Sequence, residues 1–214
     1  KDILRNVSFS AKPGQIIGIT GAVACGKSTL GKAFLCELPY EGSITFGGEE
    51  LRDMDKNRRS SIFGYLGHDP ELLSASIREN ICMGDGQDPA PYLHAVRLDR
   101  EVTEMEQGPD TLVGPEGHRL SGGQAQRLAL ARTLYHKRPV LILDDPFSAL
   151  DKPTEAEIFR ELRELAKDSI VLLISHRLYL FPQLDRVLWM ENGTVTAGTH
   201  EELLQKVPAY RALA

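Results

Sequence analysis

A glycine-rich stretch at residues 21–29, GAVACGKST, constrains the fold of this chain more than any other part of its sequence. It fits the pattern G-x-x-x-x-G-K-[ST] and stands between a short apolar run, Gln15 to Thr20, and a segment of helical character, Ser28 to Leu38. Between a strand and a helix, such a loop curls so that backbone N–H groups and the helix N-terminus face a phosphate. The stretch therefore predicts a phosphate-binding loop.

The residue types in this loop suit nucleotide phosphates and a magnesium ion. Lys27 would reach the β and γ phosphates, and the Ser28 hydroxyl would be a ligand of Mg²⁺. The predicted nucleotide-binding residues are Gly21, Ala24, Cys25, Gly26, Lys27, Ser28 and Thr29. The alternative is an ordinary glycine-rich turn, which the flanking strand and helix disfavour.

Strands and helices alternate along most of the chain, which predicts an α/β fold of the P-loop NTPase type. Strands are expected at residues 3–9, 15–20, 43–46, 61–66, 140–144, 169–174 and 186–190, and helices at 28–38 and 153–167. Such alternation implies a mainly parallel sheet covered on both faces, and a hairpin-like turn at 191–194 adds an antiparallel β portion.

The middle of the chain is mostly helical and polar and interrupts this alternation. Loops are expected within it at residues 83–91 and 108–118. We therefore expect one domain, residues 1–214, whose core comprises about 1–68 and 138–214, with an inserted α-helical sub-lobe at about 69–137.

Composition excludes several classes of protein. The 214 residues carry a formal net charge of −5 with scattered Lys and Arg, which argues against a nucleic-acid partner. No apolar run reaches the ~18 residues of a membrane-spanning helix. The three cysteines lack zinc-site spacing, which indicates reduced thiols in a cytosol. The chain begins at a lysine within an amphipathic segment, so we expect it to be part of a longer protein.

Two further motifs indicate chemistry. The stretch LSGGQ at residues 120–124 opens a segment rich in helix formers, where a serine and two glycines can form a second anion site or a plain N-cap. The stretch LILDDPFSALD at 141–151 is an apolar strand that runs into two carboxylates, Asp144 and Asp145. A metal ion and a reacting water could be held at such an acidic edge.

Together, from Ile3 to the end, these motifs resemble the ATP-binding cassette (ABC) ATPases of membrane transporters. The resemblance implies ATP and Mg²⁺ as cofactors, with Asp144 as the Walker B aspartate that holds the metal. It implies that Asp151 lies in a D-loop, SALD, at a subunit contact, and that His176 touches the γ-phosphate. The residues of the signature, Ser121, Gly122, Gly123 and Gln124, would close over the ATP of a second cassette in a head-to-tail dimer.

A finer resemblance is to the exporter branch of this family. The stretches SIRENI at residues 76–81 and GTHEEL at 198–203 match sequences common in exporter cassettes. The resemblance implies a transmembrane domain as partner, a position at the cytoplasmic face of the cell membrane, and an adenine-stacking aromatic residue before Lys1. The alternatives are a soluble cassette protein of translation or DNA maintenance, a detached importer subunit, and a regulatory ATP-binding module without turnover.

Three positions depart from the family pattern. Asp145 stands where a glutamate normally polarises the attacking water, His68 stands where a glutamine ligates Mg²⁺, and the TLVGPEG stretch at 111–117 carries its acid one place late. Losing one methylene withdraws a carboxylate by roughly 1 Å, which can cost on the order of a hundredfold in rate. An imidazole is a poorer Mg²⁺ ligand than an amide oxygen.

These departures affect hydrolysis more than ATP binding. We predict catalytic roles for Asp145, His176 and His68, and a metal site made by Ser28, Asp144 and His68. The chain's own site is expected to hold ATP and hydrolyse it slowly, while its intact signature completes the site of a different partner cassette. The alternative is an active site in which both changes are tolerated.

Overall fold

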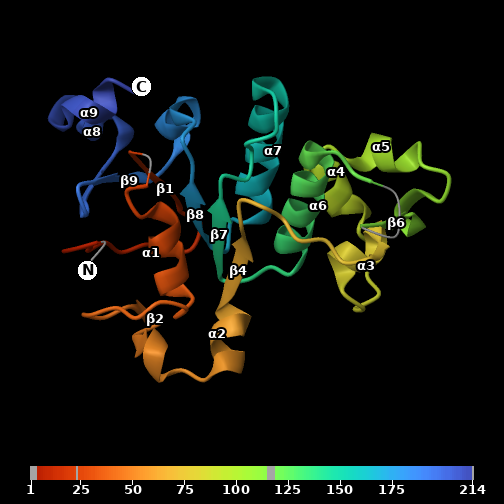
Figure 1. Cartoon of the computed structure of the whole chain (residues 1–214), viewed down its shortest axis with the longest axis horizontal. Coiled ribbons are helices and arrows are strands. Elements are labelled where there is room, and N and C mark those ends of the chain that lie inside the picture. Colours follow the sequence, from red (N-terminus) through yellow and green to blue (C-terminus); the bar gives the residue numbers. More distant parts are fainter. Residues whose placement is uncertain (1–3, 23, 115–118, 214) are drawn as a thin grey trace.

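A six-stranded sheet crosses the molecule in the order β10-β9-β1-β8-β7-β4 (Figure 1). The computed structural model describes residues 4–22, 24–114 and 119–213. The strands are β1 (Ile16–Gly21), β4 (Phe63–Leu66), β7 (Val140–Asp144), β8 (Ile170–Ile174), β9 (Arg186–Glu191) and β10 (Thr194–Gly198). All neighbours pair in parallel except β10, which pairs antiparallel with β9. The predicted α/β class, with a mainly parallel sheet and an antiparallel portion, is confirmed.

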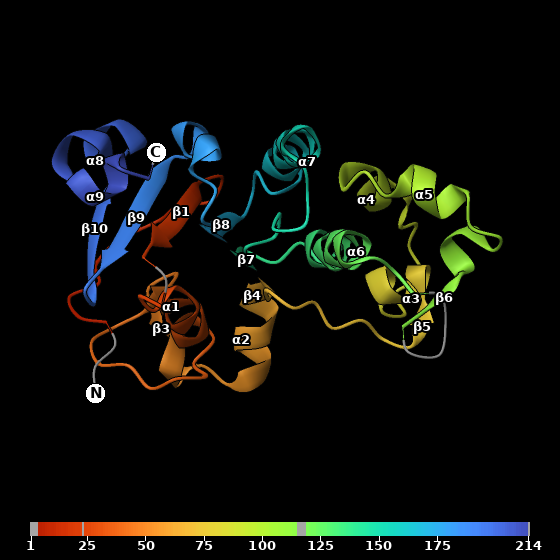
Figure 2. The same cartoon turned by 45° about the horizontal axis from the view of Figure 1, so that its top comes forward.

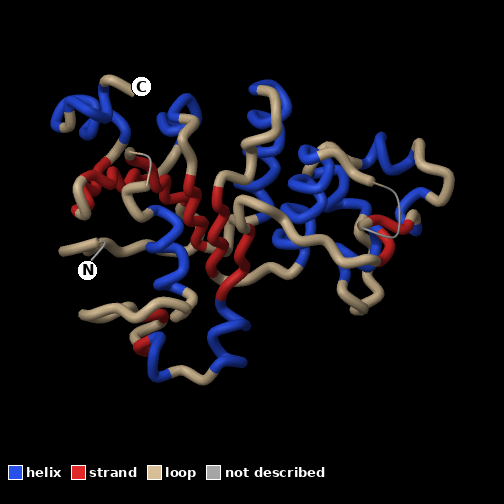
Figure 3. The backbone as a smooth tube through the Cα atoms, viewed as in Figure 1, coloured by secondary structure: helices blue, strands red, loops and turns tan. Residues whose placement is uncertain are grey.

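Two short antiparallel pairs and a set of helices complete the fold (Figure 3). The pairs are β2 (Thr45–Phe46) with β3 (Glu49–Glu50), and β5 (Ala75–Ser76) with β6 (Leu112–Val113). The α-helices are α1 (Lys27–Phe34), α2 (Lys56–Ile62), α3 (Ile77–Cys82), α4 (Ala90–Ala95), α5 (Asp99–Thr103), α6 (Gly122–Tyr135), α7 (Lys152–Leu165), α8 (His200–Lys206) and α9 (Pro208–Arg211). Three 3₁₀ segments are η1 (Leu51–Asp53), η2 (Gly108–Asp110) and η3 (Leu178–Gln183). Among the described helices, none has the length and apolar character needed to cross a membrane.

The two faces of the sheet are covered by different helices because side chains alternate along each strand. Ile142 of β7 packs in one hydrophobic cluster with Leu30 and Phe34 of α1. Leu143, the next residue, belongs to a second cluster with Leu128 of α6 and residues of α7. Helix α1 therefore lies on one face, and α6 and α7 lie on the other. Burial on both faces explains why β7 and β8 read as continuous apolar runs.

Helices α3, α4 and α5 lie beyond α6, at the end of the molecule opposite α8 and α9 (Figure 2). Ile77, Leu93 and Val102 from these helices share a single cluster with Leu128 of α6 and with sheet residues. The helical region is thus packed onto the sheet through α6 instead of having a core of its own. The predicted sub-lobe boundaries stay a prediction.

The strand expected at residues 3–9 was wrong for the part that the structure describes, residues 4–9. That segment has no strand pairing, although Arg5 N donates to Gly193 O at 2.6 Å and Phe9 packs edge-on against Phe34. Its alternating apolar residues are partly buried against the core. The alternation in the sequence therefore reflects this packing and not the hydrogen-bonded pairing of a strand. Ile3 lies outside the described residues.

Two other predicted boundaries lie elsewhere in the structure. Ser61 and Ile62, expected in a strand, end helix α2, because the N–H of its C-cap Phe63 still donates to Arg59 O within the helix. Helix α1 ends at Phe34 and not at Leu38, because Cys36 adopts a left-handed conformation with φ of 54°. The loop expected at 108–118 contains η2 and β6, and its residues 115–118 lie outside the described part of the chain.

Candidate nucleotide site

The phosphate loop follows β1 and is shaped by its glycines. Gly21 has φ of +153°, and a Cβ there would lie 2.1 Å from Met190 O, so no larger residue fits. Ala24 and Gly26 also have positive φ, of 58° and 100°, which turns the chain into α1. Gly26 is the N-cap of α1 and provides no side-chain cap, so the first N–H groups of the helix can face an anion.

Lys27 lies within this loop and does not project into solvent. Its Nζ donates to Gly21 O at 3.1 Å and to Ala22 O at 2.9 Å, and lies 3.7 Å from Cys25 Sγ. The residue is buried, with 8% of its surface exposed. The ammonium group is therefore held inside the loop by two backbone carbonyls, and its predicted contact with phosphate stays a prediction.

Ser28 and Asp144 meet although 116 residues separate them. Ser28 Oγ donates to Asp144 Oδ2 at 2.8 Å, and Asp144 is buried at the carboxyl end of β7. Both offer the oxygen ligands that Mg²⁺ prefers. Among the described residues, no group of three or more His, Cys, Asp or Glu side chains could hold a metal. Mg²⁺ bound here would take its remaining ligands from phosphate and water.

Two of the three departures from the family pattern, His68 and Asp145, lie next to each other, and the displaced acid of the third, Glu116, lies outside the described residues. His68 Nδ1 is 4.0 Å from Asp145 Oδ2, with the histidine side chain 60% exposed and the aspartate 19%. Asp145 has φ of +50°, and its N–H donates to Ile174 O at 2.8 Å. His176 is exposed just beyond β8, the strand between β1 and β7. Asp145 and His176 thus follow neighbouring strands at the same edge of the sheet.

The signature forms the start of helix α6 through a capping box. Ser121 Oγ accepts from Gln124 N at 3.2 Å, and Gln124 Oε1 accepts from Ser121 N at 2.8 Å. The predicted N-cap is therefore present, and the anion-binding role of the signature stays a prediction. A Cβ on Gly123 would lie 3.3 Å from Ala149 O, so the D-loop runs close to the signature helix. Gly122 has open space around its Cα.

The signature does not reach the phosphate loop of its own chain. Helices α1 and α6 cover opposite faces of the sheet, and no hydrogen bond or ion pair joins residues 121–124 to the described residues of 21–29 (Figure 1). The sites predicted from these two motifs are separate within one chain.

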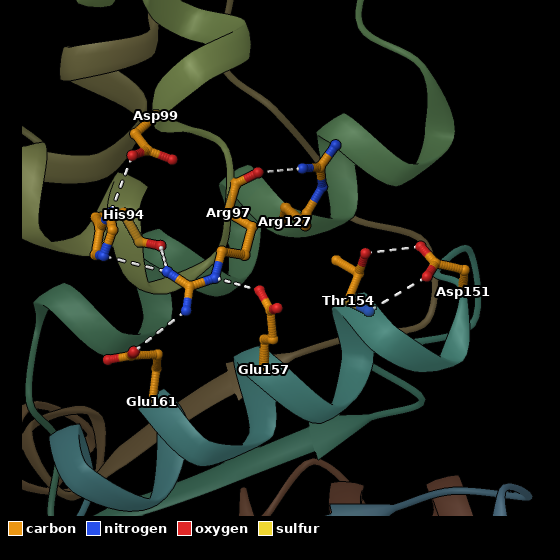
Figure 4. A network of polar contacts seen from close by, with 8 residues as sticks. All are labelled: His94, Arg97, Asp99, Arg127, Asp151, Thr154, Glu157 and Glu161. Carbon is orange, nitrogen blue, oxygen red and sulfur yellow. Dashed lines mark hydrogen bonds and ion pairs between the residues drawn. The ribbon is translucent and has the colours of Figure 1, made fainter.

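Asp151 of the D-loop is the N-cap of α7. Its carboxylate accepts from Thr154 Oγ1 at 2.7 Å and from Thr154 N at 3.3 Å (Figure 4). These hydrogen bonds, the hydroxyl first, hold the pKa of Asp151 below its usual value. The bonds fix the direction in which the D-loop enters α7.

An arginine network, not recognised from the sequence, ties the helical region to α6 and α7 (Figure 4). Arg97 Nε lies 2.8 Å from Glu157 Oε2, and its Nη2 lies 3.5 Å from Glu161 Oε1, both on α7. The Arg97 carbonyl accepts from Arg127 Nη1 of α6 at 2.5 Å, and Arg127 pairs with Glu101 at 2.6 Å. Arg97 thus links the signature helix α6 to α7, the helix that follows the D-loop.

Cys25 provides a test of the phosphate loop that needs no mutation. Cys25 is half-exposed within the loop, so a nucleotide bound there would cover it. We expect maleimide to label Cys25 in the nucleotide-free protein and MgATP to slow that labelling. Mass spectrometry of the peptides measures the extent of labelling at each cysteine. Cys36 is half-exposed outside the loop and is the internal control, which should react equally in both states. Equal labelling of Cys25 with and without MgATP would contradict the assignment.

The fold and the site together define a P-loop nucleotide-binding α/β protein. The ABC transporter family model matches residues 4–148, and the chain belongs to this family. The resemblance inferred from the sequence motifs is confirmed.

Relatives of the chain include exporter proteins. It is 37% identical over 98% of its length to a probable multidrug resistance ABC transporter ATP-binding/permease protein of Bacillus subtilis. It is 38% identical over 94% of its length to the toxin RTX-I translocation ATP-binding protein of Actinobacillus pleuropneumoniae. A bacterial Atm1-family ABC exporter with ATP bound matches 99% of the chain with a TM-score of 0.92 and 31% identity. The chain spans 37%, 29% and 38% of these three proteins.

Proposed function

We propose that this chain is an ATP-binding and ATP-hydrolysing cassette that powers export of a substrate across a membrane. The observation that carries the proposal is the hydrogen bond of 2.8 Å between Ser28 and Asp144 below the phosphate loop. It supports a metal site beside the position of the phosphates, which is what cleavage of a phosphoanhydride needs. The names of the relatives, multidrug resistance and toxin translocation, support export.

Each residue of the site has a distinct task in this reaction. Lys27 and the N-terminus of α1 bind the phosphates and offset their charge. Ser28 and Asp144 would hold Mg²⁺, which would supply positive charge to offset that of the phosphates. Asp145 orients and polarises the water that attacks the γ-phosphorus, and His176 contacts the γ-phosphate. The bond to the β-phosphate oxygen breaks, and ADP and phosphate leave.

A second cassette completes the site in this proposal. Because the signature and the phosphate loop lie apart within one chain, closure over ATP requires Ser121 and the two signature glycines of a neighbour. A head-to-tail pair satisfies both chains at once, with each signature over the other's ATP. Each chain would then sit with a transmembrane domain at the cytoplasmic face of the membrane.

The pair is proposed to be a heterodimer with one weak site. Asp145 and His68 lie side by side, so both departures affect the same γ-phosphate region of this chain's own site. Asp145 lacks the reach of a glutamate, and His68 offers a nitrogen where Mg²⁺ prefers oxygen. The signature is intact, which supports a role in completing a competent site on the partner.

The rival functions lack a supporting feature. A soluble cassette of translation or DNA maintenance would need a nucleic-acid surface, and the net charge of −5 with scattered basic residues disfavours one. A detached importer subunit is disfavoured because the name of one relative, an ATP-binding/permease protein, places the ATP-binding part and the permease part in one protein. A regulatory module without turnover is distinguished from an ATPase by measuring phosphate release, as described in the next paragraph.

The proposed dimer predicts how ATP turnover depends on protein concentration. The 214-residue chain should be mainly monomeric and a weak ATPase, because no membrane domain raises the local concentration of the partner signature. Specific activity, measured as phosphate release, should rise with concentration, and mixing with a partner cassette should raise it further. Turnover that stays linear in protein at high dilution would contradict the shared site, and no turnover in the complete transporter would leave only a regulatory module.

A further inference from the structure

Arg177 joins the end of β8 to the D-loop. Its Nη1 donates to Leu150 O at 2.8 Å, and its Nη2 donates to Ser148 O at 2.8 Å. The backbone N–H of Arg177 donates to Ser175 Oγ at 3.0 Å, which closes a tight turn with His176 at its tip. One residue thus holds the His176 turn by its backbone and the D-loop by its side chain.

A buried carboxylate holds the guanidinium group in place. Glu155, in the first turn of α7, is 0% exposed, and its Oε2 lies 2.7 Å from Arg177 Nη1. A carboxylate removed from water requires a paired cation with good geometry. Arg177 is therefore confined to one position, and the backbone of residues 148–150 is confined with it.

The same contacts extend to Asp145. Ser148 N donates to Asp145 O at 3.1 Å, while Ser148 O accepts from Arg177. Asp145 and His176, which face the γ-phosphate in the proposed function, are thereby connected through Ser148 and Arg177. Among the described residues, the hydrogen bonds of the guanidinium group go to neither Asp145 nor His176.

We propose that Arg177 is a positioning residue that holds the D-loop and the His176 turn in one fixed arrangement. This inference rests on the proposed function and deepens it. In a head-to-tail dimer His176 serves the chain's own ATP, whereas the D-loop lies at the subunit contact. Arg177 then ties the geometry of the chain's own site to that of the partner's site, and loss of its contacts lowers turnover even where the own site is weak.

An arginine is required for this task because its acceptors lie in different directions. The fork of the guanidinium group reaches Ser148 O, Leu150 O and Glu155 at the same time. A lysine keeps the positive charge for Glu155 but offers a single nitrogen, so it cannot hold both D-loop carbonyls in this geometry. Arg177→Lys therefore separates positioning from charge compensation.

The experiment compares Arg177→Lys with wild type in the complete transporter. We expect kcat for ATP to fall about tenfold, since a misplacement of about 1 Å can cost up to a hundredfold. KM and the affinity for a fluorescent ATP analogue should stay within about twofold of wild type, because the phosphate loop is untouched. The melting temperature of the 214-residue chain should change little, since the charge opposite Glu155 remains.

Two further variants separate positioning from folding. The double variant Arg177→Met with Glu155→Leu removes the half-buried arginine together with its buried partner, which often preserves stability, yet it should show the same loss of kcat. Arg163→Lys is the matched control, because Arg163 also pairs with a carboxylate, that of Asp185, and donates to a backbone carbonyl, but away from the D-loop. Its kcat should equal that of wild type.

The possible outcomes separate this inference from the proposed function. If the wild-type transporter hydrolyses ATP and the Arg177→Lys variant has the same kcat, the positioning role is overturned. The ATPase assignment is then unaffected. A fall in kcat that matches a loss of folded protein, and that Arg163→Lys shares, also overturns the positioning role. A wild-type transporter that neither binds nor hydrolyses ATP overturns both.

Discussion

Replacing Lys27 with alanine should abolish nucleotide binding while the fold remains. In the proposed site the Lys27 ammonium pairs with phosphate charge, and removing one partner of a buried charge pair costs about a hundredfold or more in affinity. The measurement is titration with a fluorescent ATP analogue, beside circular dichroism of the same samples. Unchanged affinity with an unchanged spectrum would rule out the phosphate-loop assignment.

The buried position of Lys27 calls for two controls. Its Nζ donates to the carbonyls of Gly21 and Ala22, so alanine removes packing and two hydrogen bonds together with the charge. Lys27→Met keeps most of the side-chain volume and should lose affinity to the same extent. Lys32→Ala, on the exposed side of the same helix, should bind nucleotide like wild type.

Ser121→Ala should reduce ATP turnover of the complete transporter far more than Asp145→Asn. In the proposed heterodimer Ser121 faces the γ-phosphate in the partner's competent site, and removing one hydrogen-bond donor to a transition state costs on the order of a hundredfold in kcat. Asp145 serves a site that already turns over slowly, so most turnover should remain. Asn tolerates the φ of +50° at this position, which makes the substitution mild for the backbone.

The structure shows why Ser121→Ala needs a cap control. Ser121 is the N-cap of α6, and its loss costs about 1 kcal/mol of helix stability apart from any catalytic role. Thr199 caps α8 with the same type of capping box, so Thr199→Ala carries the same cost without touching the signature. Its turnover should equal wild type, and Ser121→Thr should restore most of the lost activity. If Asp145→Asn proves as damaging as Ser121→Ala, the two sites are equivalent and the chain forms a homodimer.

Restoring the family residues at the weak site should increase ATP turnover in the same assay. Asp145→Glu with His68→Gln should raise hydrolysis at this site, by about tenfold if the lost reach is the main defect. The positive φ of Asp145 offsets part of this gain, because glutamate adopts that conformation less readily than aspartate.

Local features of this chain were readable from its sequence. The turn at residues 21–29 was readable because its glycines and its flanking strand and helix are neighbours in the sequence, and Ala24 and Gly26 have positive φ. The strands β7 and β8 were found because burial on both faces leaves continuous apolar runs. The hairpin of β9 and β10 followed from Asn192 and Gly193, which both have positive φ. The same local reasoning was wrong at residues 4–9, where alternation occurs without strand pairing.

The contacts that join distant segments were decided only by the tertiary structure. The order of the strands brings the ends of β1, β7 and β8 to one edge, and only there do Ser28 and Asp144 meet. His68 reaches Asp145 because β4 lies beside β7. The hydrogen bonds from Arg177 to the D-loop carbonyls could not be predicted from the sequence, because an arginine that follows a strand is usually exposed to solvent. Periodicity and turn chemistry depend on residues a few places apart, whereas these contacts depend on which strands are neighbours in the sheet.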